Sequence, residues 1–237
     1  MLKILFFTIT LAGCSLGMAQ KISGEALLDK AIAYHDPNNH WNTLKTELTV
    51  TMTSPDTGKR VSNIIIDFPN EYFSLIATRN GVITEQILHK DDCRLSLNED
   101  SDISKESAKK YRLTCERARM MKDYYTYLYG LPMKLKDPGT KIHPDVQQRG
   151  FKGKQYLVLK AEYEAKVGND IWYFYFDPKT YAMKVYQFFH DEEKNDGEYI
   201  LLKDEEIISD IKMPKTREWY YNLDDTYLGT DVLSKHI

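Results

Sequence analysis

The sequence lacks most of the local signals that reveal a biochemical activity. It has no Gly-x-Ser-x-Gly, Walker loop, His-Glu-x-x-His or Cys-x-x-Cys motif, so we assign no catalytic residue, no metal ligand and no cofactor. Beyond the N-terminus there is no run of ~20 apolar residues of the kind that spans a membrane. Long blocks of one charge sign are also missing, which argues against binding to nucleic acid and against electrostatic capture by anionic lipid.

What remains is typical of one large domain. The chain has 237 residues, of which 42% are hydrophobic and 28% charged, enough for a substantial core. If Lys3 is removed with an N-terminal leader, 31 of the 32 basic side chains remain against 35 acidic ones, a net charge of −4.

The first twenty residues, MLKILFFTITLAGCSLGMAQ, combine one lysine with an apolar run of the length found in secretory signals. Two processing sites fit this signal peptide. Gly17-Met18-Ala19 matches a small-x-small cleavage pattern, whereas Leu11-Ala12-Gly13-Cys14 resembles a lipobox that would leave a lipidated Cys14. We expect removal of residues 1–19, or of 1–13 in a lipoprotein, and a single domain over residues 20–237.

This leader predicts a location in the periplasm or cell envelope. A lipid on Cys14 would be the one attachment of the protein to the outer membrane. The segment from the processing site to about Ser23 is expected to be disordered, because termini are loose unless they are tied down.

Cysteine is scarce. Of three residues, Cys93 and Cys115 lie outside the leader, in what should be an oxidising compartment. A disulfide between them would close a loop of about 22 residues and contribute about 3 kcal/mol through the unfolded state. Two separately buried thiols are the alternative.

Hydrophobic periodicity predicts an α+β fold: a strongly curved antiparallel sheet, or half-barrel, with an N-terminal helix and an inserted helical segment. Apolar residues spaced as in helices predict one helix after Ser23 and one longer helix between Asp100 and Leu128. Residues 133–148 are expected to form a long irregular connection. Alternation predicts nine or ten strands, at 44–52, 61–68, 72–78, 82–89, 93–97, 155–163, 171–176, 181–189, 198–208 and 216–221.

The most apolar stretch is a hairpin, IWYFYFDPKTYAMKVYQFF, over residues 171–189. Alternation places one set of its aromatic side chains on each face, and Asp177-Pro178-Lys179-Thr180 supplies the turn. A sheet that packs on one side should be polar on the other. Both faces of this hairpin must therefore be covered by protein or hold a ligand.

Tyrosine is abundant, with 17 residues, and four of them crowd the end of the longer predicted helix. Tyr has an apolar body and a polar tip, which suits the wall of a pocket for an amphipathic ligand but equally a seam between helix and sheet. The candidate ligand-binding residues are Trp172, Phe174, Tyr181, Met183, Tyr125 and Tyr129.

The order of these elements resembles the LolA/LolB-like lipoprotein-carrier superfamily. In that superfamily a strand, an Asp-Pro-x-Thr turn and a second strand recur late in the domain, as Trp172 to Thr180 do here. Gly197 and Met213-Pro214 match the turn and strand end that follow. The resemblance implies a half-barrel whose hydrophobic concave side, in the carriers, holds acyl chains. The carriers also tether a helical lid with an arginine, to which these motifs assign no residue of this chain.

At closer range, residues 29–36 (DKAIAYHD) and 125–134 (YTYLYGLPMK) are similar to an uncharacterised family of secreted bacterial envelope proteins. We therefore expect a hydrophobic or amphipathic ligand, such as a lipid or lipoprotein acyl chain. Two alternatives stay open at this stage. The sheet could have a filled core and dock a partner protein, or a histidine and a carboxylate could converge in a cleft as a dispersed hydrolase site.

Overall fold

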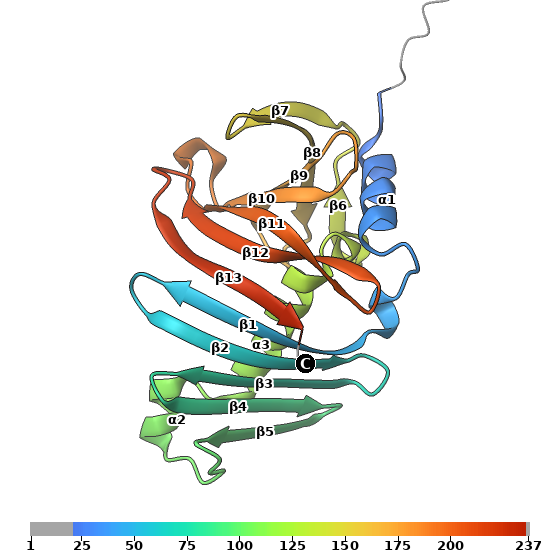
Figure 1. Ribbon diagram of the computed structural model, residues 1–237. Helices are drawn as coiled ribbons and strands as arrows, with labels where there is room; N and C mark the ends of the chain where they lie inside the picture. Colours follow the sequence, from blue (N-terminus) through green and yellow to red (C-terminus); the bar gives the residue numbers. More distant parts are fainter. Residues whose placement is uncertain (1–20, 236–237) are drawn as a thin grey trace, which may run out of the picture.

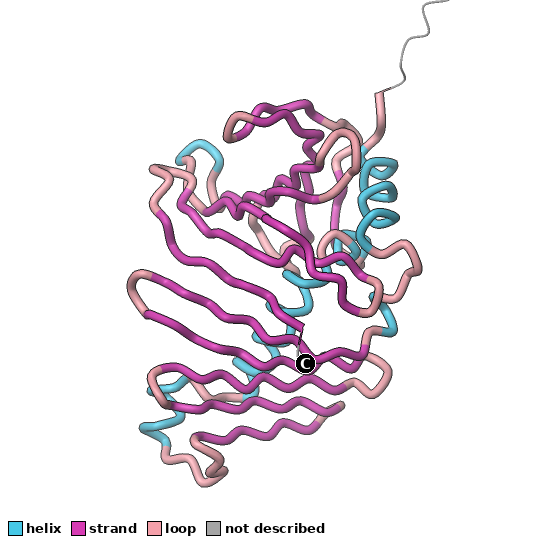
Figure 2. Tube along the Cα trace, in the orientation of Figure 1, coloured by secondary structure: helices cyan, strands magenta, loops and turns pink. Residues whose placement is uncertain are grey.

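In the computed structural model, which describes residues 21–235, thirteen strands form one antiparallel sheet (Figure 1). The sheet curves strongly and stays open, as Figure 2 shows, so the expected fold class is confirmed. Its strands are β1 Lys45–Ser54, β2 Gly58–Asp67, β3 Tyr72–Arg79, β4 Val82–His89, β5 Asp92–Leu97, β6 Thr140–Ile142, β7 Gln147–Phe151, β8 Lys154–Tyr163, β9 Ile171–Phe176, β10 Met183–Phe189, β11 Glu198–Ile208, β12 Ile211–Tyr221 and β13 Tyr227–Lys235. The helices are α1 Gly24–His35, α2 Lys105–Tyr111 and α3 Cys115–Gly130, with short 3₁₀ turns η1 Trp41–Thr43, η2 Met133–Lys136 and η3 Glu192–Lys194.

Two meanders meet in the middle of the sheet. The strand order is β5-β4-β3-β2-β1-β13-β12-β11-β10-β9-β8-β6, and β7 also pairs with β8. The junction is the pairing of β1 with β13, which runs from Leu48 opposite Lys235 to Thr53 opposite Thr230. The inserted segment with α2, α3 and η2 connects the first meander to the second.

The sequence analysis did not predict three of the strands. The segment expected to be irregular contains β6, of three residues, and the start of β7. The third, β13, reads YLGTDVLSK and carries Gly229 and several polar residues, so its alternation is weak. Pairing with neighbours on both sides, β1 and β12, makes it a strand in spite of its sequence.

The inserted helix is also shorter than predicted, because it is two helices. Arg112 ends α2 in the left-handed conformation with φ 54°, and the hydroxyl of Thr114 then accepts a hydrogen bond from Arg117 N at 3.1 Å as the N-cap of α3. The apolar spacing continues across the break, so periodicity alone could not show it.

A disulfide joins Cys93 on β5 to Cys115, the first residue of α3. It fixes the start of α3 beside the outermost strand of the first meander. At its other end α3 approaches η1 so closely that a Cβ on Gly130 would overlap the ring of Trp41. The helix is thus positioned at both termini.

Both faces of the central hairpin are covered by protein. On the face toward α3, Phe174 and Phe176 are fully buried in the main core. On the other face, Tyr173 and Tyr175 belong to a second cluster with Tyr156 and Tyr199. The tip of the β7–β8 hairpin covers this cluster.

Two residues at the tip of the β7–β8 hairpin hold it over this second cluster. The ring of Phe151 lies 5.2 Å from the rings of both Tyr175 and Tyr199. Next to it, Lys152 forms an ion pair with Asp225 at 2.7 Å. The outer cluster is therefore a small core of its own, and the apolar character of this face needs no ligand to explain it.

The residues before α1 are ordered where the structure describes them. Ile22 packs on the core, Ser23 forms a bridge with Asp145, and Gly24 N donates to Pro144 O at 2.8 Å. The expectation of disorder up to Ser23 is wrong for these residues, since the chain end is tied to the segment before β7. The signal peptide, Cys14 and both processing sites lie outside the described residues.

A buried histidine connects α1 to the sheet. Nδ1 of His35 donates to Lys212 O at 2.6 Å, and Nε2 accepts from Met183 N at 3.0 Å. Only the neutral imidazole can donate at one nitrogen and accept at the other. Burial lowers the pKa of His35 below its ordinary value of 6.5.

We therefore predict that the protein loses stability as the pH falls from 7 to 5. Below pH 6.5 the unfolded chain takes up a proton at His35 that the folded chain does not bind, so protonation favours unfolding. Denaturant titrations at several pH values measure the slope. His35→Gln should be less stable at pH 7 and flatter over this range, whereas the exposed control His89→Gln should keep the wild-type slope. An unchanged slope in His35→Gln would contradict the assignment.

We also predict that the double variant Cys93→Ser, Cys115→Ser is less stable by about 3 kcal/mol, because the disulfide closes a loop with a sequence separation of 22. Urea unfolding of the oxidised protein and the variant measures the difference. Alkylation of the unreduced, denatured protein followed by mass analysis should add no label at Cys93 or Cys115.

Candidate functional site

Helix α3 crosses the concave face of the sheet and divides it into two pockets. Figure 1 shows α3 running behind the first meander, with α2 at its start. One pocket, of about 690 Å³, lies between β2, β3, β4 and the two helices, and we call it the basic pocket. The other, of about 550 Å³, lies between α3 and the segments around η2, β6 and β9, and we call it the tyrosine pocket. Both volumes are within the usual range for ligand sites.

The basic pocket has an apolar wall. Alternation along the three strands turns every second side chain toward α3, and these include Leu75, Ala77 and Val82. Met121 of α3 faces them from the other side. These aliphatic side chains are interspersed with polar ones, because Ser62 and Thr84 flank Ala77 and Gln86 lies opposite Leu75.

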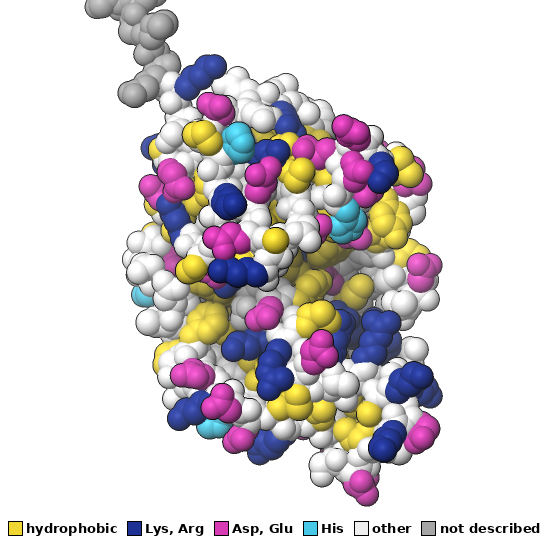
Figure 3. Space-filling view, turned by 180° about the vertical axis from the view of Figure 1, so that it is seen from behind, with side chains coloured by type: hydrophobic (Ala, Val, Ile, Leu, Met, Phe, Trp, Pro, Cys, Tyr) yellow, Lys and Arg dark blue, Asp and Glu magenta, His cyan; other side chains and the backbone are white. Residues whose placement is uncertain are grey.

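Cations surround this wall. The basic residues that line the pocket are Arg60, Arg79, Lys110, Arg112 and Arg117. Figure 3, which views this side of the molecule, shows a hollow with hydrophobic side chains along it and Lys and Arg side chains beside it, on the side where α2 lies. The pocket therefore combines a few aliphatic side chains with an excess of positive charge.

Arg60 is fixed by a short hydrogen-bond chain. Its Nη2 donates to the hydroxyl of Tyr125 at 3.3 Å, and that hydroxyl donates to Ser62 Oγ at 3.2 Å. Burial, followed by the charge of Arg60, lowers the pKa of Arg79. Burial and the charges of Arg112 and Arg60 likewise lower the pKa of Arg117. The guanidinium groups thus repel one another across the pocket.

The tyrosine pocket is of mixed polarity. The hydroxyls of Tyr127 and Tyr163 lie 2.5 Å apart, and the indole of Trp172 lies 5.7 Å from the ring of Tyr127. Asp170 and Asp137 line the same space, together with Lys134, which pairs with Asp137. Three Asp and two Lys line the pocket in all, so its net charge is small and it has no strong preference for one charge.

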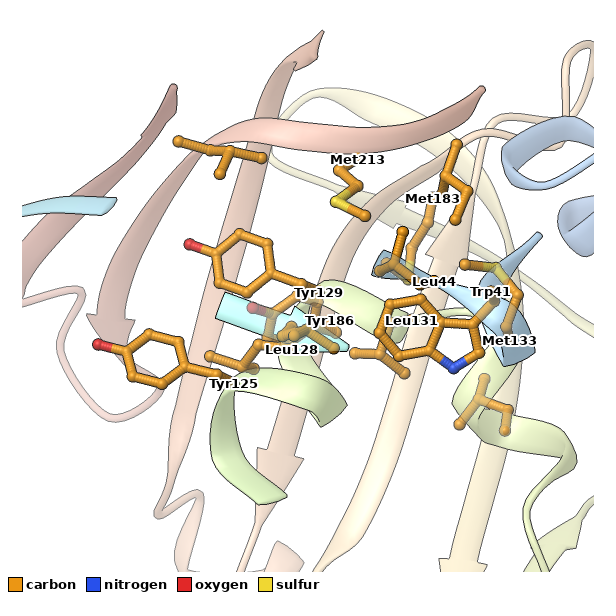
Figure 4. Close-up of a cluster of buried hydrophobic side chains, with 14 of the residues drawn as sticks. Trp41, Leu44, Tyr125, Leu128, Tyr129, Leu131, Met133, Met183, Tyr186 and Met213 are labelled. Atoms are coloured by element: carbon orange, nitrogen blue, oxygen red, sulfur yellow. The ribbon is translucent and has the colours of Figure 1, made fainter. Parts of the chain in front are cut away.

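The structure does not bring the six candidate ligand-binding residues to one place. Tyr125 lines the basic pocket and Trp172 the tyrosine pocket. Phe174, Met183 and Tyr129 are buried in the core between the two, as Figure 4 shows for Met183 and Tyr129. Tyr181 lies outside both pockets, beside α1, where the ammonium group of Lys30 is 5.0 Å from its ring.

Sequence reasoning missed the arginines of the basic pocket. A signal was present, because Arg60 shares the alternation phase of Ser62 and Ile64, which face the core. A charged residue in an inward phase is unusual at the end of a strand. That Arg60 meets Arg79 depends on the register between β2 and β3, which the sequence did not supply.

Arg217 was also missed, and it anchors the C-terminal end of α3. Its side chain is fully buried, with Nη2 donating to Leu128 O at 3.1 Å and Nη1 to Pro214 O at 3.0 Å. The guanidinium carbon lies 4.0 Å from the centre of the Tyr129 ring. One arginine of β12 therefore holds the last turn of α3 against the sheet.

A histidine and a carboxylate do meet near the tyrosine pocket. Nδ1 of His190 lies 2.7 Å from Asp170, which raises the pKa of His190, but 62% of the His190 side chain is exposed. Within residues 21–235 no hydroxyl or thiol forms a hydrogen bond with this ring, so no nucleophile accompanies the pair. The same part of the chain contains no cluster of three or more potential metal ligands. It also has no helix of the length and hydropathy needed to cross a membrane.

Comparison with known proteins places the sequence in a family. A family model described as a family of unknown function, DUF6503, matches residues 2–235. The chain belongs to this family. No curated protein matches the sequence.

Among solved structures, the fold is similar to a LolA superfamily protein from Nitrosomonas europaea, with 10% identity, a TM-score of 0.51 and coverage of 90% of this chain and 92% of that chain. The expected LolA-like fold is thereby confirmed. A DUF1329 family protein from Desulfovibrio piger has 10% identity, a TM-score of 0.49 and coverages of 90% and 92%. A Vibrio parahaemolyticus domain named for outer membrane lipoprotein sorting has 11% identity, a TM-score of 0.49 and coverages of 90% and 90%. The last two TM-scores are too low to support an argument.

We predict that Arg217→Lys costs about 3 kcal/mol of stability, because an ammonium group cannot replace both hydrogen bonds and the contact with Tyr129. Denaturant unfolding measures the cost, and hydrogen exchange should show faster exchange of the last turn of α3. The exposed control Arg94→Lys should change stability by less than about 0.5 kcal/mol. A similarly small change in Arg217→Lys would show that Arg217 does not anchor α3.

Proposed function

We propose that the protein is a non-enzymatic envelope protein that binds an amphipathic ligand in the hollow of its curved sheet. In this proposal residues 1–19, or 1–13 with lipidation at Cys14, direct export, and residues 20–237 form one ligand-binding domain. A lipid or a lipoprotein acyl chain has the required chemistry. The fold shared with a LolA superfamily protein supports the proposal at the level of architecture.

The observation that carries the proposal is the composition of the basic pocket. Its aliphatic wall offers a hydrocarbon chain a surface to bury, and its cations offer a polar head a place to remain solvated or paired. A filled core would not have left this space. The volume of about 690 Å³ is large enough for a ligand of lipid size.

The docking alternative accounts for a different part of the concave face. Between the pockets the face is filled by its own side chains, with Tyr186 and Tyr129 (Figure 4) and also Phe174 all buried. That part supports α3 and leaves no space for a ligand. The hollow beside it is what favours binding.

We predict that Ala77→Phe abolishes uptake of a dansyl-labelled fatty acid into the basic pocket. Ala77 faces the hollow between Ser62 and Thr84, so a phenyl ring there would occupy the space without disturbing the buried core. The matched control is Thr78→Phe, the next residue, whose side chain is exposed on the opposite face. Dansyl fluorescence titration should show binding by the wild type and the control, with at least ~10-fold weaker binding by Ala77→Phe.

A second variant, Trp172→Ala, tests the other pocket and should leave uptake unchanged. Native mass spectrometry of protein purified from its own envelope should reveal a bound lipid. A wild-type protein that neither retains a lipid nor binds the probe would contradict the proposed function.

A further inference from the structure

The charge of the basic pocket is opposite to that of the protein as a whole. The chain has a formal net charge of −3, yet the basic pocket is lined by four arginines and one lysine and, within residues 21–235, by no Asp or Glu. Such a local excess of one sign in a low-dielectric hollow attracts ligands of the other sign.

The arginines are also not neutralised by the protein. Among the described residues, no carboxylate lies within ion-pair distance of Arg60, Arg79, Arg112 or Arg117. Asp231 interacts electrostatically with Arg60, but the two groups are more than 4.0 Å apart. The carboxylate of Asp231 instead accepts a hydrogen bond from Trp219 at 3.2 Å. Arg217, by contrast, donates to two backbone carbonyls.

The sheet register brings two of these cations face to face. Arg60 on β2 and Arg79 on β3 are direct cross-strand partners with their side chains on the concave face. Like charges directly opposite each other destabilise an antiparallel pair. This arrangement weakens the free protein, and a bound anion would relieve it.

Polar atoms inside the pocket lack partners. The Nε atoms of Arg60 and Arg79 are buried without a hydrogen bond, and so is Oε1 of Gln86, whose side chain is 7% exposed and lies on the pocket wall. Buried polar atoms are normally paired, and each orphan costs free energy. Three of the six buried side-chain atoms without a partner among the described residues lie around this one hollow, and a bound anion would supply acceptors for the two Nε–H groups.

The chemistry of that ligand follows from these groups. Adjacent guanidinium groups donate paired hydrogen bonds to an oxyanion that has several oxygens, as phosphate has. Several cations together also favour an anion with more than one negative charge. The hollow is much larger than a free phosphate, and its wall also carries four aliphatic side chains, Leu75, Ala77, Val82 and Met121. We propose that the basic pocket recognises a phosphate headgroup carried by a hydrocarbon chain, with Arg60 and Arg79 binding the phosphate. This inference rests on the proposed function and adds the class of headgroup to it.

Calorimetric titration of the oxidised, full-length protein tests the inference with four probes. Lysophosphatidic acid combines the phosphate with an acyl chain, while a monoacylglycerol and a fatty acid of the same chain length lack the phosphate. Glycerol phosphate lacks the chain. Lysophosphatidic acid should bind at least ~10-fold more tightly than each of the other three, since charge-assisted hydrogen bonds and chain burial then act together. Its affinity should also fall with added salt.

Two variants and a matched control locate the interaction. Arg60→Gln and Arg79→Gln should each reduce lysophosphatidic acid binding by ~10-fold or more and leave monoacylglycerol binding unchanged. Arg119→Gln, on the exposed side of α3 and outside the pocket, should change neither. Arg79→Gln should not lower the Tm of the free protein, because it removes the repulsion from Arg60.

The outcomes separate the two proposals. If the monoacylglycerol or the fatty acid binds as tightly as lysophosphatidic acid, the phosphate headgroup is wrong and the amphipathic ligand stands. If glycerol phosphate binds as tightly as the lipid, an anion site exists but the amphipathic ligand is wrong. If none of the four binds, both proposals are overturned. A loss of lysophosphatidic acid binding in Arg119→Gln equal to that in Arg79→Gln would also overturn the assignment.

Discussion

The position of α3 across the concave face is the constraint on which the rest of the structure depends. The helix is fixed at its start by the Cys93–Cys115 disulfide and at its end by hydrogen bonds from the buried Arg217. Between these anchors its tyrosines pack on the central hairpin and fill the middle of the hollow. What stays open lies to either side, so the anchoring of one helix determines both the number and the location of the pockets.

The two meanders consequently have different roles. Most of the central hairpin of the second meander is buried on both faces, the outer one beneath Phe151 and Lys152, and its start at Trp172 borders the tyrosine pocket. The first meander has the curved sheet without the filling, and its inward-facing side chains near the strand ends are polar or cationic. The most hydrophobic part of the chain therefore provides rigidity, and a less conspicuous part provides the candidate site.

The sequence allowed prediction wherever a feature depended on neighbouring residues. Ser23 is the N-cap of helix α1, and Asp177 accepts hydrogen bonds from Lys179 N and Thr180 N in the expected turn. Features that depend on distant residues were not predictable. Strand β13 required its partners, and the opposition of Arg60 and Arg79 required the register of β2 on β3. The aromatic residues were the candidates for a site because their excess is visible in the composition. The five cations of the basic pocket come from four separate elements, and in a chain of mixed charge the sequence does not show that they cluster.

The pairing of β1 with β13 has a consequence for the order in which the chain can fold. These two strands are the first and the last of the described sheet, and their ladder is what joins the two meanders. Each meander is built from sequence-adjacent hairpins and can form as its residues become available, but the junction closes a loop that includes nearly the whole described chain. Contacts of such large sequence separation form slowly because the entropy of loop closure precedes any gain from pairing. A chain emerging from its N-terminus thus keeps an unpaired β1 edge until β13 arrives, and the curvature that creates the hollow is completed by the last strand.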